Sequence, residues 1–224
     1  MLIPSIDLMG GKIVQLIQGS RKELEFDNFP EWVDRFSKYP LVQLIDLDAA
    51  MGHGNNAALV RGFAGQLPCQ VGGGIRTLEA AEATSALGAR RVIVGSSLIS
   101  NGKINADFAK QLAEKIGAEK LVFAADSRGG FISIKGWKET TAIPTLDMLK
   151  ALDSYCSAFL YTHIDTEGLL KGFPVDVVRE LRGATTKQLI VAGGIRSQEE
   201  VDELHGLGAD AVVGMAIYRG LMKA

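Results

Sequence analysis

Short apolar runs recur along the whole chain, and each is followed by a turn rich in glycine, aspartate or serine. The runs are continuously apolar rather than alternating with polar residues, which is typical of strands that are covered on both faces. A segment with helical periodicity follows each turn. We expect eight strands, at Leu2–Ile6, Leu41–Ile45, Cys69–Val71, Arg91–Val94, Leu121–Ala125, Ala158–Thr162, Leu189–Val191 and Ala211–Val213.

Helix starts can be placed between the expected strands. Pro30, Pro144 and Pro174 stand at expected first helical turns, where the missing backbone N–H of proline is tolerated. Ser197 is followed by Gln-Glu-Glu, which is typical of a capping box at a helix start. Strand and helix therefore alternate, and dividing 224 residues by eight units gives 28 residues for each unit. We predict a single (β/α)8 TIM barrel domain over residues 1–224.

The alternative to a closed barrel is a doubly wound open sheet. Such sheets usually have fewer strands, and no Gly-x-Gly-x-x-Gly motif follows the first expected strand. An internal repeat also favours the barrel. Motifs of the first half return 119 or 120 residues later, as Asp7 and Asp126 and as Gly73–Arg76 and Gly193–Arg196. The repeat predicts two half-barrels, roughly 1–119 and 120–224, whose equivalent sites face each other across one mouth.

Composition limits the class of ligand. The 24 Lys and Arg residues are balanced by 26 Asp and Glu residues, so the net charge is only −2 and we expect no nucleic-acid partner. Three histidines and two cysteines are scattered without the spacing of a zinc site, and we predict no bound metal. Cys69 and Cys156 are expected to be buried and reduced.

The N-terminal residues give no sign of targeting to a membrane. The chain starts directly with an expected strand and lacks the basic and apolar regions of a signal peptide. No stretch approaches the roughly 18 apolar residues that a membrane helix needs. We therefore expect a cytoplasmic protein with no membrane partner, and we expect it to be a monomer.

Two aspartates are the main candidates for catalysis. Asp7 and Asp126 end the first and fifth expected strands, and active sites of TIM barrels form at the carboxyl ends of the strands. Two carboxyl groups in different environments can divide into a general base and a general acid, which suits proton transfer next to an imine or carbonyl. An isolated aspartate at such a position can also cap a loop, but the repeat places both at equivalent positions.

Glycine clusters after four strands suggest phosphate binding. Free backbone N–H groups near the start of a helix form a cradle for an anion. Each half of the repeat supplies one such cradle, the first from Gly73, Gly74, Gly95 and Ser96 and the second from Gly193, Gly194, Gly214 and Met215. Two cradles predict an elongated small-molecule substrate with a phosphate at each end.

Other polar residues near strand ends have two possible uses. Asp46 could orient substrate hydroxyls or bind loop amides, and Trp137 could stack on a planar ring of the ligand or pack beneath a loop. Arg76 and Arg196 could reach a phosphate, although pairing with neighbouring helix acids is favoured. His163 could be catalytic, but a lone histidine beside a strand more often has a structural use.

A set of motifs in order along the chain resembles one family. The motifs are Ile3–Leu8 with Gly11-Lys12, Val71–Arg76, Asp126, Gly136-Trp137, Tyr161-Thr162 and Ala192–Gly194. Together they resemble the phosphoribosylformimino-aminoimidazole-carboxamide ribotide isomerases of histidine biosynthesis, over essentially the whole chain. The resemblance implies an Amadori rearrangement of an aminoaldose to an aminoketose without a cofactor. It assigns Asp7 as the general base, Asp126 as the general acid and Thr162 as a threonine that assists catalysis.

The resemblance has departures and leaves alternatives open. Thr166–Leu169 reads Thr-Glu-Gly-Leu where bacterial members usually have a stretch like Arg-Asp-Gly-Thr, so the resemblance gives no role to Glu167. Gln15 stands where arginine is common. The related cyclase subunit of imidazole glycerol phosphate synthase is disfavoured, because its characteristic lysine after the first strand is not evident. A bifunctional isomerase that also uses phosphoribosylanthranilate and a non-catalytic phosphate-binding barrel remain alternatives.

Overall fold

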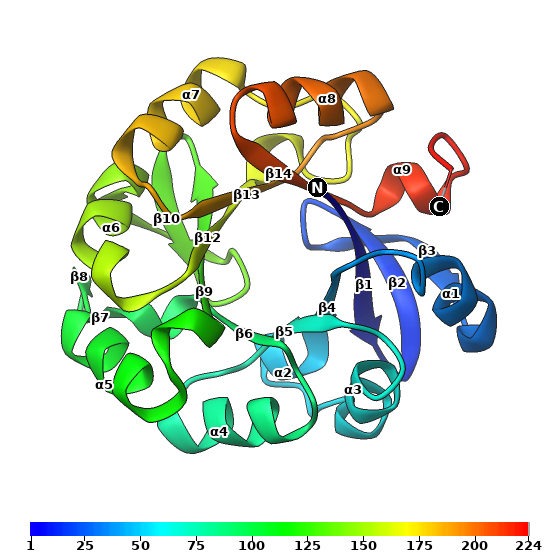
Figure 1. The fold of residues 1–224 in the computed structure, drawn as a ribbon, viewed down its shortest axis with the longest axis horizontal. Helices are drawn as coiled ribbons and strands as arrows, with labels where there is room; N and C mark the ends of the chain where they lie inside the picture. The colour runs from blue at the N-terminus through cyan, green and yellow to red at the C-terminus, as the bar shows by residue number, and fades with distance from the viewer. Residues whose placement is uncertain (224) are drawn as a thin grey trace.

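The computed structural model describes residues 1–223 and contains a closed ring of parallel strands. Hydrogen-bonded pairing runs around the ring, β1 joining β14 and β6 joining β9 to close it (Figure 1). Its eight strands are β1 (Leu2–Met9), β4 (Val42–Asp46), β5 (Cys69–Gly72), β6 (Arg91–Val94), β9 (Leu121–Arg128), β12 (Ala158–His163), β13 (Gln188–Ala192) and β14 (Ala209–Val213). All eight expected strands are confirmed, and the closed ring excludes the open sheet.

Helices cover the outside of the ring, as Figure 1 shows. They are α1 (Phe29–Phe36), α2 (Leu47–Met51), α3 (Ala57–Ala64), α4 (Leu78–Ala86), α5 (Ala106–Ile116), α6 (Thr145–Leu152), α7 (Val175–Ala184), α8 (Gln198–Gly206) and α9 (Met215–Tyr218). Because helices cover the outer face of the parallel ring, its eight strands are buried on both faces, as their continuously apolar sequences require.

Local capping explains where several helices begin. The Ser197 hydroxyl accepts a hydrogen bond from the Glu200 backbone N–H at the start of α8, which confirms the expected helix start. The Glu200 carboxylate accepts from the Arg196 N–H instead of the Ser197 N–H, one residue away from the usual capping-box partner. Pro30 lies in the first turn of α1 as expected, whereas Pro144 and Pro174 immediately precede α6 and α7.

Alternation along the strands divides the buried residues between two clusters. On β9, Phe123 and Ala125 belong to the cluster between the sheet and the helices, whereas Val122 faces the interior of the barrel. Ala124 packs against the interior cluster, and Asp126 lies two residues further along on the same face. The alternation of side chains along the strand therefore directs Asp126 into the barrel. Burial of the apolar residues of the interior cluster stabilises the fold.

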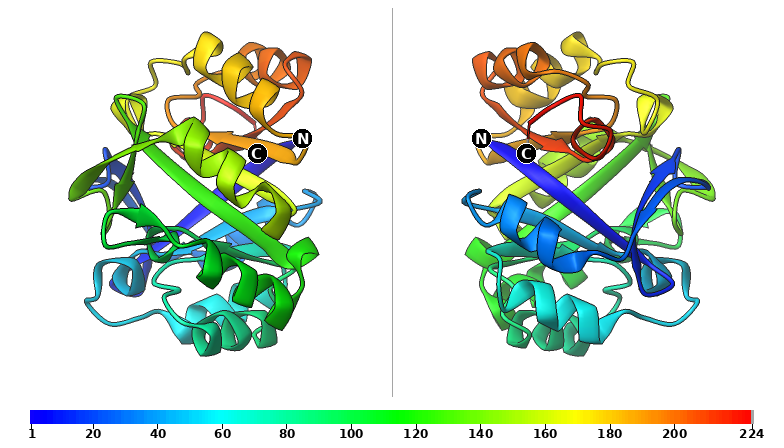
Figure 2. Two further views of the ribbon diagram at one scale, coloured as in Figure 1. Left: turned by 90° about the vertical axis from the view of Figure 1, so that its left-hand side faces the viewer. Right: turned by 90° about the vertical axis from the view of Figure 1, so that its right-hand side faces the viewer.

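Two hairpins at the mouth of the barrel were not expected from the sequence. β2 (Lys12–Ile17) and β3 (Arg21–Phe26) continue from β1, and β10 (Phe131–Ile134) and β11 (Glu139–Pro144) continue from β9. Figure 2 shows both hairpins, one blue and one green, at the same end of the barrel. A short third hairpin joins β7 (Ile99–Ser100) and β8 (Lys103–Ile104). The first two hairpins follow the strands that carry Asp7 and Asp126, so they flank the site.

The structure also tests the expectations for the two cysteines and for a membrane helix. Cys69 and Cys156 are both buried free thiols, and burial raises the pKa of each to about 12. Neither thiol is therefore a thiolate near neutral pH, and the expected structural use of both residues agrees with their burial. Within residues 1–223, no helix has the length and apolar character needed to cross a membrane.

Candidate active site

A cavity at the carboxyl ends of the barrel strands contains nearly all of the predicted site residues. Its lining includes Asp7, Asp126, Thr162, Trp137, Gly73, Gly74, Gly95, Ser96, Gly193, Gly194, Gly214 and Met215. Asp46 is the exception, since it does not line the cavity. The two halves of the chain therefore contribute equivalent groups to one space, as the repeat predicts.

Asp7 lies towards the carboxyl end of β1 and lines the cavity. Its backbone lies between β4 and β2, paired with Ile45 on one side and with Val14 on the other. The Ser5 hydroxyl donates a hydrogen bond of 3.0 Å to the Asp7 carboxylate. Burial raises the pKa of Asp7 to about 6, and the bond from Ser5 acts in the opposite direction. Asp7 is thus mostly ionised at neutral pH while keeping a higher proton affinity than an exposed aspartate.

Asp126 lies on β9 and has two hydrogen-bond donors. The indole N–H of Trp137 donates to its Oδ2 atom at 2.8 Å, and the Thr162 hydroxyl supplies a second hydrogen bond. Thr162 lies beside Asp126 because β12 and β9 pair these two residues in register. Burial raises the pKa of Asp126 above its ordinary value, while both donors favour the ionised form and limit the rise.

Glu167 is a third carboxyl group in the cavity, and sequence analysis gave it no role. It follows the 3-10 turn η4 (Ile164–Thr166) after β12, and its backbone carbonyl accepts a hydrogen bond from the Gln18 N–H. Burial raises the pKa of Glu167 to about 8, and the negative charges of Asp7 and Asp126 contribute to the rise. Glu167 is therefore protonated at neutral pH. Its position after the carboxyl end of a barrel strand was the signal available in the sequence.

The glycine clusters adopt backbone conformations that require glycine. Gly73 and Gly193 have φ angles of +110° and +102°, and Gly74 and Gly194 have φ angles of +69° and +82°. A Cβ atom at Gly193 would lie 2.6 Å from the His163 carbonyl oxygen, so the backbones approach too closely for a side chain. Each cluster therefore presents bare backbone to the cavity, which is the property that a phosphate cradle needs.

Short helical turns begin beside each cluster. Ser96 starts the 3-10 turn η1 (Ser96–Leu98) and Met215 starts α9, directly after Gly95 and Gly214. At the first cluster, the Ser96 hydroxyl accepts a hydrogen bond of 3.0 Å from the Lys135 backbone N–H of the β10–β11 hairpin. The hairpin that carries Trp137 is therefore attached to the first cradle.

The arginines after the glycine clusters bind protein groups. Arg196 forms an ion pair with Glu200 at 2.8 Å, as the favoured interpretation expects. Arg76 lines the cavity but pairs with no helix acid, because its guanidinium donates to the carbonyl oxygens of Ala49 and Ala50. The expectation of an acidic partner for Arg76 is therefore wrong, since its guanidinium binds backbone carbonyls of the short helix α2 that follows β4.

The Asp46 carboxylate binds amides of the following segment, the second of the two uses considered for it. Its carboxylate accepts hydrogen bonds from the Ala49 N–H at 3.1 Å, from the Asn56 N–H at 2.6 Å and from the Asn56 side-chain amide at 2.8 Å. Both oxygens therefore hold the loop from β4 to α3. Asp46 ends β4, as expected. Its carboxylate oxygens bind these amides, and not the substrate hydroxyls that were the other use considered.

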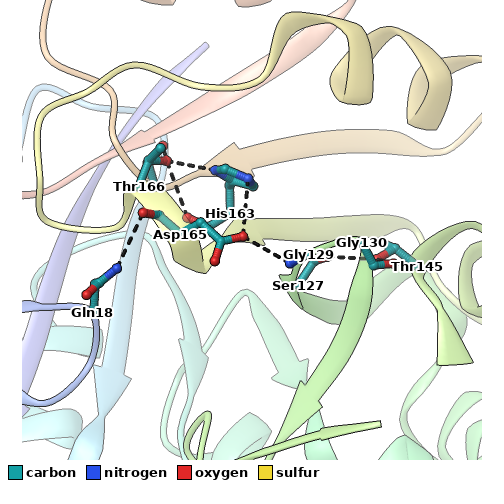
Figure 3. A network of polar contacts seen from close by, with 9 residues as sticks. Gln18, Ser127, Gly129, Gly130, Thr145, His163, Asp165 and Thr166 are labelled. Carbon is teal, nitrogen blue, oxygen red and sulfur yellow. Dashed lines mark hydrogen bonds and ion pairs between the residues drawn. The ribbon is translucent and has the colours of Figure 1, made fainter. Parts of the chain in front are cut away.

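His163 and Asp165 form a polar network in the turn after β12. Its Nδ1 atom lies 2.9 Å from the Thr166 hydroxyl, and its Nε2 atom lies 3.7 Å from the Asp165 carboxylate (Figure 3). Asp165 also accepts from the Gly129 N–H at 3.0 Å, and its carbonyl accepts from the Gln18 side chain at 3.4 Å. Burial lowers the pKa of His163. These contacts indicate a structural use for His163, which fixes the turn before Glu167.

Metal ligation is a separate possibility for the acidic groups. Across the part of the chain that the structure describes, no group of three or more His, Cys, Asp or Glu side chains is arranged to hold a metal ion. Asp7, Asp126 and Glu167 share the cavity but act on one another through their charges. Carboxyl groups with separate proton affinities are suited to acid and base chemistry.

Comparison with known proteins identifies the family. The family model described as histidine biosynthesis protein matches residues 1–223. The chain belongs to this family, and it is an isomerase. It is 40% identical to 1-(5-phosphoribosyl)-5-((5-phosphoribosylamino)methylideneamino)imidazole-4-carboxamide isomerase of Methanocaldococcus jannaschii, over 99% of this chain and 94% of that protein. It is 37% identical to the isomerase of the same name from Thermus thermophilus, over 99% of this chain and 96% of that protein.

Proposed function

We propose that the chain catalyses the isomerisation for which its relatives are named, an Amadori rearrangement of a bis-phosphorylated aminoaldose to an aminoketose in histidine biosynthesis. One observation carries the proposal. Two buried carboxyl groups from equivalent strand ends share a single cavity with two glycine cradles. This arrangement fits a substrate with a phosphoribosyl group at each end and a reacting sugar between them.

Thr162 and Asp126 carry the first step of the proposed reaction. Asp126, oriented by the Thr162 hydroxyl, donates a proton to the ribose ring oxygen, and the bond between this oxygen and C1 breaks. The nitrogen lone pair forms the C1=N bond of a protonated Schiff base. Burial raises the pKa of Asp126 above its ordinary value, which favours the protonated form that a general acid needs.

Asp7 carries the second step. The Schiff base makes the C2 hydrogen acidic, and the ionised Asp7 carboxylate removes it as a proton. The electron pair left on C2 forms the C1=C2 bond of an enolamine, which then tautomerises to the aminoketose. The pKa of Asp7, about 6, leaves the group ionised at pH 7 with enough basicity for a general base. The rearrangement exchanges oxidation levels between two carbons of one molecule and needs no external oxidant or reductant.

The two glycine cradles hold the ends of the substrate. One phosphate is expected at Gly73, Gly74, Gly95 and Ser96, and the other at Gly193, Gly194, Gly214 and Met215. Backbone N–H groups and helix starts attract anions without specific side chains. Binding both phosphates fixes the sugar along one axis, so C2 and the ring oxygen face opposite aspartates.

An isomerase assay of the wild type beside Asp7→Asn and Asp126→Asn tests the proposal. Each variant is expected to lose about a thousandfold in kcat, because a positioned acid or base contributes 10²- to 10⁴-fold. Asp34→Asn, at an exposed position on α1, is the matched control and should retain full turnover. Normal turnover by either site variant would contradict the role given to that aspartate.

The substrates in the same assay separate the alternatives. The wild type is expected to convert the phosphoribosyl carboxamide ribotide. Turnover of phosphoribosylanthranilate as well would extend the function to a bifunctional isomerase. Tight binding of the ribotide without turnover by the wild type would contradict the proposal and favour a non-catalytic phosphate-binding barrel.

A further inference from the structure

The contact between Trp137 and Asp126 favours the ionised form of a group that must carry a proton to act as a general acid. The indole N–H is only a donor, and it points at the Oδ2 atom of Asp126 from 2.8 Å. The Thr162 hydroxyl is a second donor to the same group. Both donors favour the ionised carboxylate, so they lower the proton affinity that burial raises.

The hairpin holds Trp137 in this position through several contacts. The ring packs on Gly19 of the β2–β3 hairpin, where a Cβ atom would lie 2.5 Å from the indole Cε3 atom. The Trp137 carbonyl accepts from Arg128 at 3.3 Å. Lys135 and Trp137 have φ angles of +57° and +66°, which is costly for residues with side chains. The indole is thus held on the acid by tertiary contacts against local backbone preference.

The reacting sugar must approach the same carboxyl group. Proton donation requires the ring oxygen within about 2.6–3.2 Å of a carboxyl oxygen of Asp126. That is the distance range in which the indole nitrogen now lies. We propose that Trp137 is a positioning residue for the general acid. Its indole N–H stabilises the ionised form of Asp126 in the free protein, and displacement of the ring by the substrate removes this hydrogen bond, so that the carboxyl group takes up a proton from solvent more readily. This inference rests on the proposed role of Asp126.

Other ionisable groups face Asp126 in the cavity. Glu167, from the turn after β12, and Asp7, from β1, are both acids and favour the protonated form of Asp126 when they are ionised. Among the described residues, the Trp137 indole and the Thr162 hydroxyl are the groups that favour the charged form of Asp126. Removal of the indole donor should therefore raise the pKa of Asp126.

Carbon-13 NMR titration of aspartate carboxyl groups in the substrate-free protein tests the proposal without an activity assay. The resonance of Asp126 is assigned by its loss in Asp126→Asn. In Trp137→Phe it is expected to titrate at higher pH than in the wild type, with about a tenfold change in its dissociation constant, because a hydrogen bond to a charged group is lost. Gly19→Ala adds a methyl group where the indole packs and leaves Trp137 in the chain, so it should also raise the pH at which Asp126 titrates.

Trp32→Phe is the matched control, because Trp32 lies on α1 and donates to Asn28 away from the cavity. It should leave the Asp126 titration unchanged. An unchanged titration in both Trp137→Phe and Gly19→Ala, or an equal change in Trp32→Phe, would overturn the inference. The result is independent of the proposed function, which fails only if Asp126→Asn keeps normal turnover.

Kinetics give a second readout that a merely structural role would not produce. The alkaline limb of the kcat/KM profile reports the acid in the free enzyme, and the limb of kcat reports it in the complex. In Trp137→Phe, the kcat/KM limb is expected to move to higher pH and the kcat limb to stay in place. Equal movement of both limbs would contradict displacement of the ring by substrate.

Discussion

The two half-barrels bring equivalent aspartates to one cavity but surround them with different donors. Asp7 receives a single hydroxyl, from Ser5 two residues earlier on the same strand. The equivalent residue 119 positions later is Ala124, which has no donor to offer Asp126. The second aspartate instead receives the Trp137 indole and the Thr162 hydroxyl. The repeat supplies two carboxyl groups at equivalent strand ends, and burial raises the pKa of both, whereas the hydrogen-bond donors that oppose the rise differ between them.

The glycine cradles of the two halves differ in a related way. A Cβ atom at Gly95 would meet Ala124 at an ordinary 3.4 Å, whereas one at Gly214 would lie 2.5 Å from the Oε1 atom of Gln15. The buried Gln15 side chain thus closes the second cradle from one side. The glycines of the two clusters therefore share similar backbone angles, and single side chains decide how much space each cluster leaves.

The largest effect is expected where both halves depend on the same backbone conformation. Gly73→Ala and Gly193→Ala should each lower the free energy of unfolding by about 3 kcal/mol, from the strain of a positive φ and close contact with a neighbouring backbone. Denaturant unfolding measures this change. Gly10→Ala, at a positive φ in open space, is the control for φ strain alone. If one of the two substitutions greatly lowered the free energy of unfolding and the other did not change it, the two glycine clusters would not be structurally equivalent.

The third carboxyl group should make stability depend on pH. The pKa of Glu167 rises from 4.5 to about 8 on folding, so between these values the folded state binds more protons than the unfolded state. The contribution of Glu167 to the free energy of unfolding is therefore fully present below pH 4.5 and is lost as the pH rises through about 8. Glu167→Gln is expected to raise the unfolding free energy by about 2 kcal/mol at pH 9 and to change it little at pH 4.

Thermal unfolding at both pH values checks the prediction for Glu167. An increase of about 5 °C in Tm at pH 9 corresponds to the expected change for a chain of this size. Glu199→Gln, at an exposed position on α8 outside the cavity, serves as the control and should not produce this dependence. Equal effects of Glu167→Gln at the two pH values would contradict a protonated Glu167.

The cradles can be compared through binding of the substrate. Gly214→Ala should raise KM about tenfold, because the new methyl group displaces Gln15, whereas Gly95→Ala should raise KM less than threefold. Steady-state kinetics of both variants provide the comparison. A stronger effect at Gly95 would reverse the assignment of the tighter cradle to the second half.

The smallest expected effect comes from the donor next to the base. Ser5→Ala removes the hydroxyl that favours ionised Asp7, so the acid limb of kcat/KM should move to higher pH by about half a unit. Ala124→Ser makes the mirror change in the other half and should move the alkaline limb to lower pH. Unchanged limbs in both variants would contradict the view that local donors differentiate the two aspartates.

The barrel and the two aspartates could be predicted from the sequence because they depend on repeated local patterns. Continuous apolar runs locate the strands, and the 119-residue offset relates Asp7 to Asp126. The hairpins β2–β3 and β10–β11 were missed because β3 and β11 are exposed and polar, so they lack the apolar run of a buried strand. Their pairing depends on strands β1 and β9 extending beyond the barrel.

The finer parts of the site depend on contacts between distant segments. The hydrogen bond from Trp137 to Asp126 depends on the fold of the β10–β11 hairpin, and the use of Asp46 depends on Asn56 in the following loop. Glu167 owes its high proton affinity to burial in the cavity and, to a lesser extent, to the charges of two aspartates from other strands. None of these relations has a sequence period, so residue patterns alone left two uses open for Asp46 and Trp137 and none assigned for Glu167.

The most direct test of the account is a crystal structure of Asp7→Asn with the bis-phosphorylated ribotide bound. The account predicts one phosphate at Gly73, Gly74 and Ser96, the other at Gly193, Gly194 and Met215, the ribose ring oxygen within hydrogen-bond distance of Asp126, and C2 beside residue 7. A substrate bound with both phosphates in one half of the barrel, or with its ribose ring away from Asp126, would contradict it.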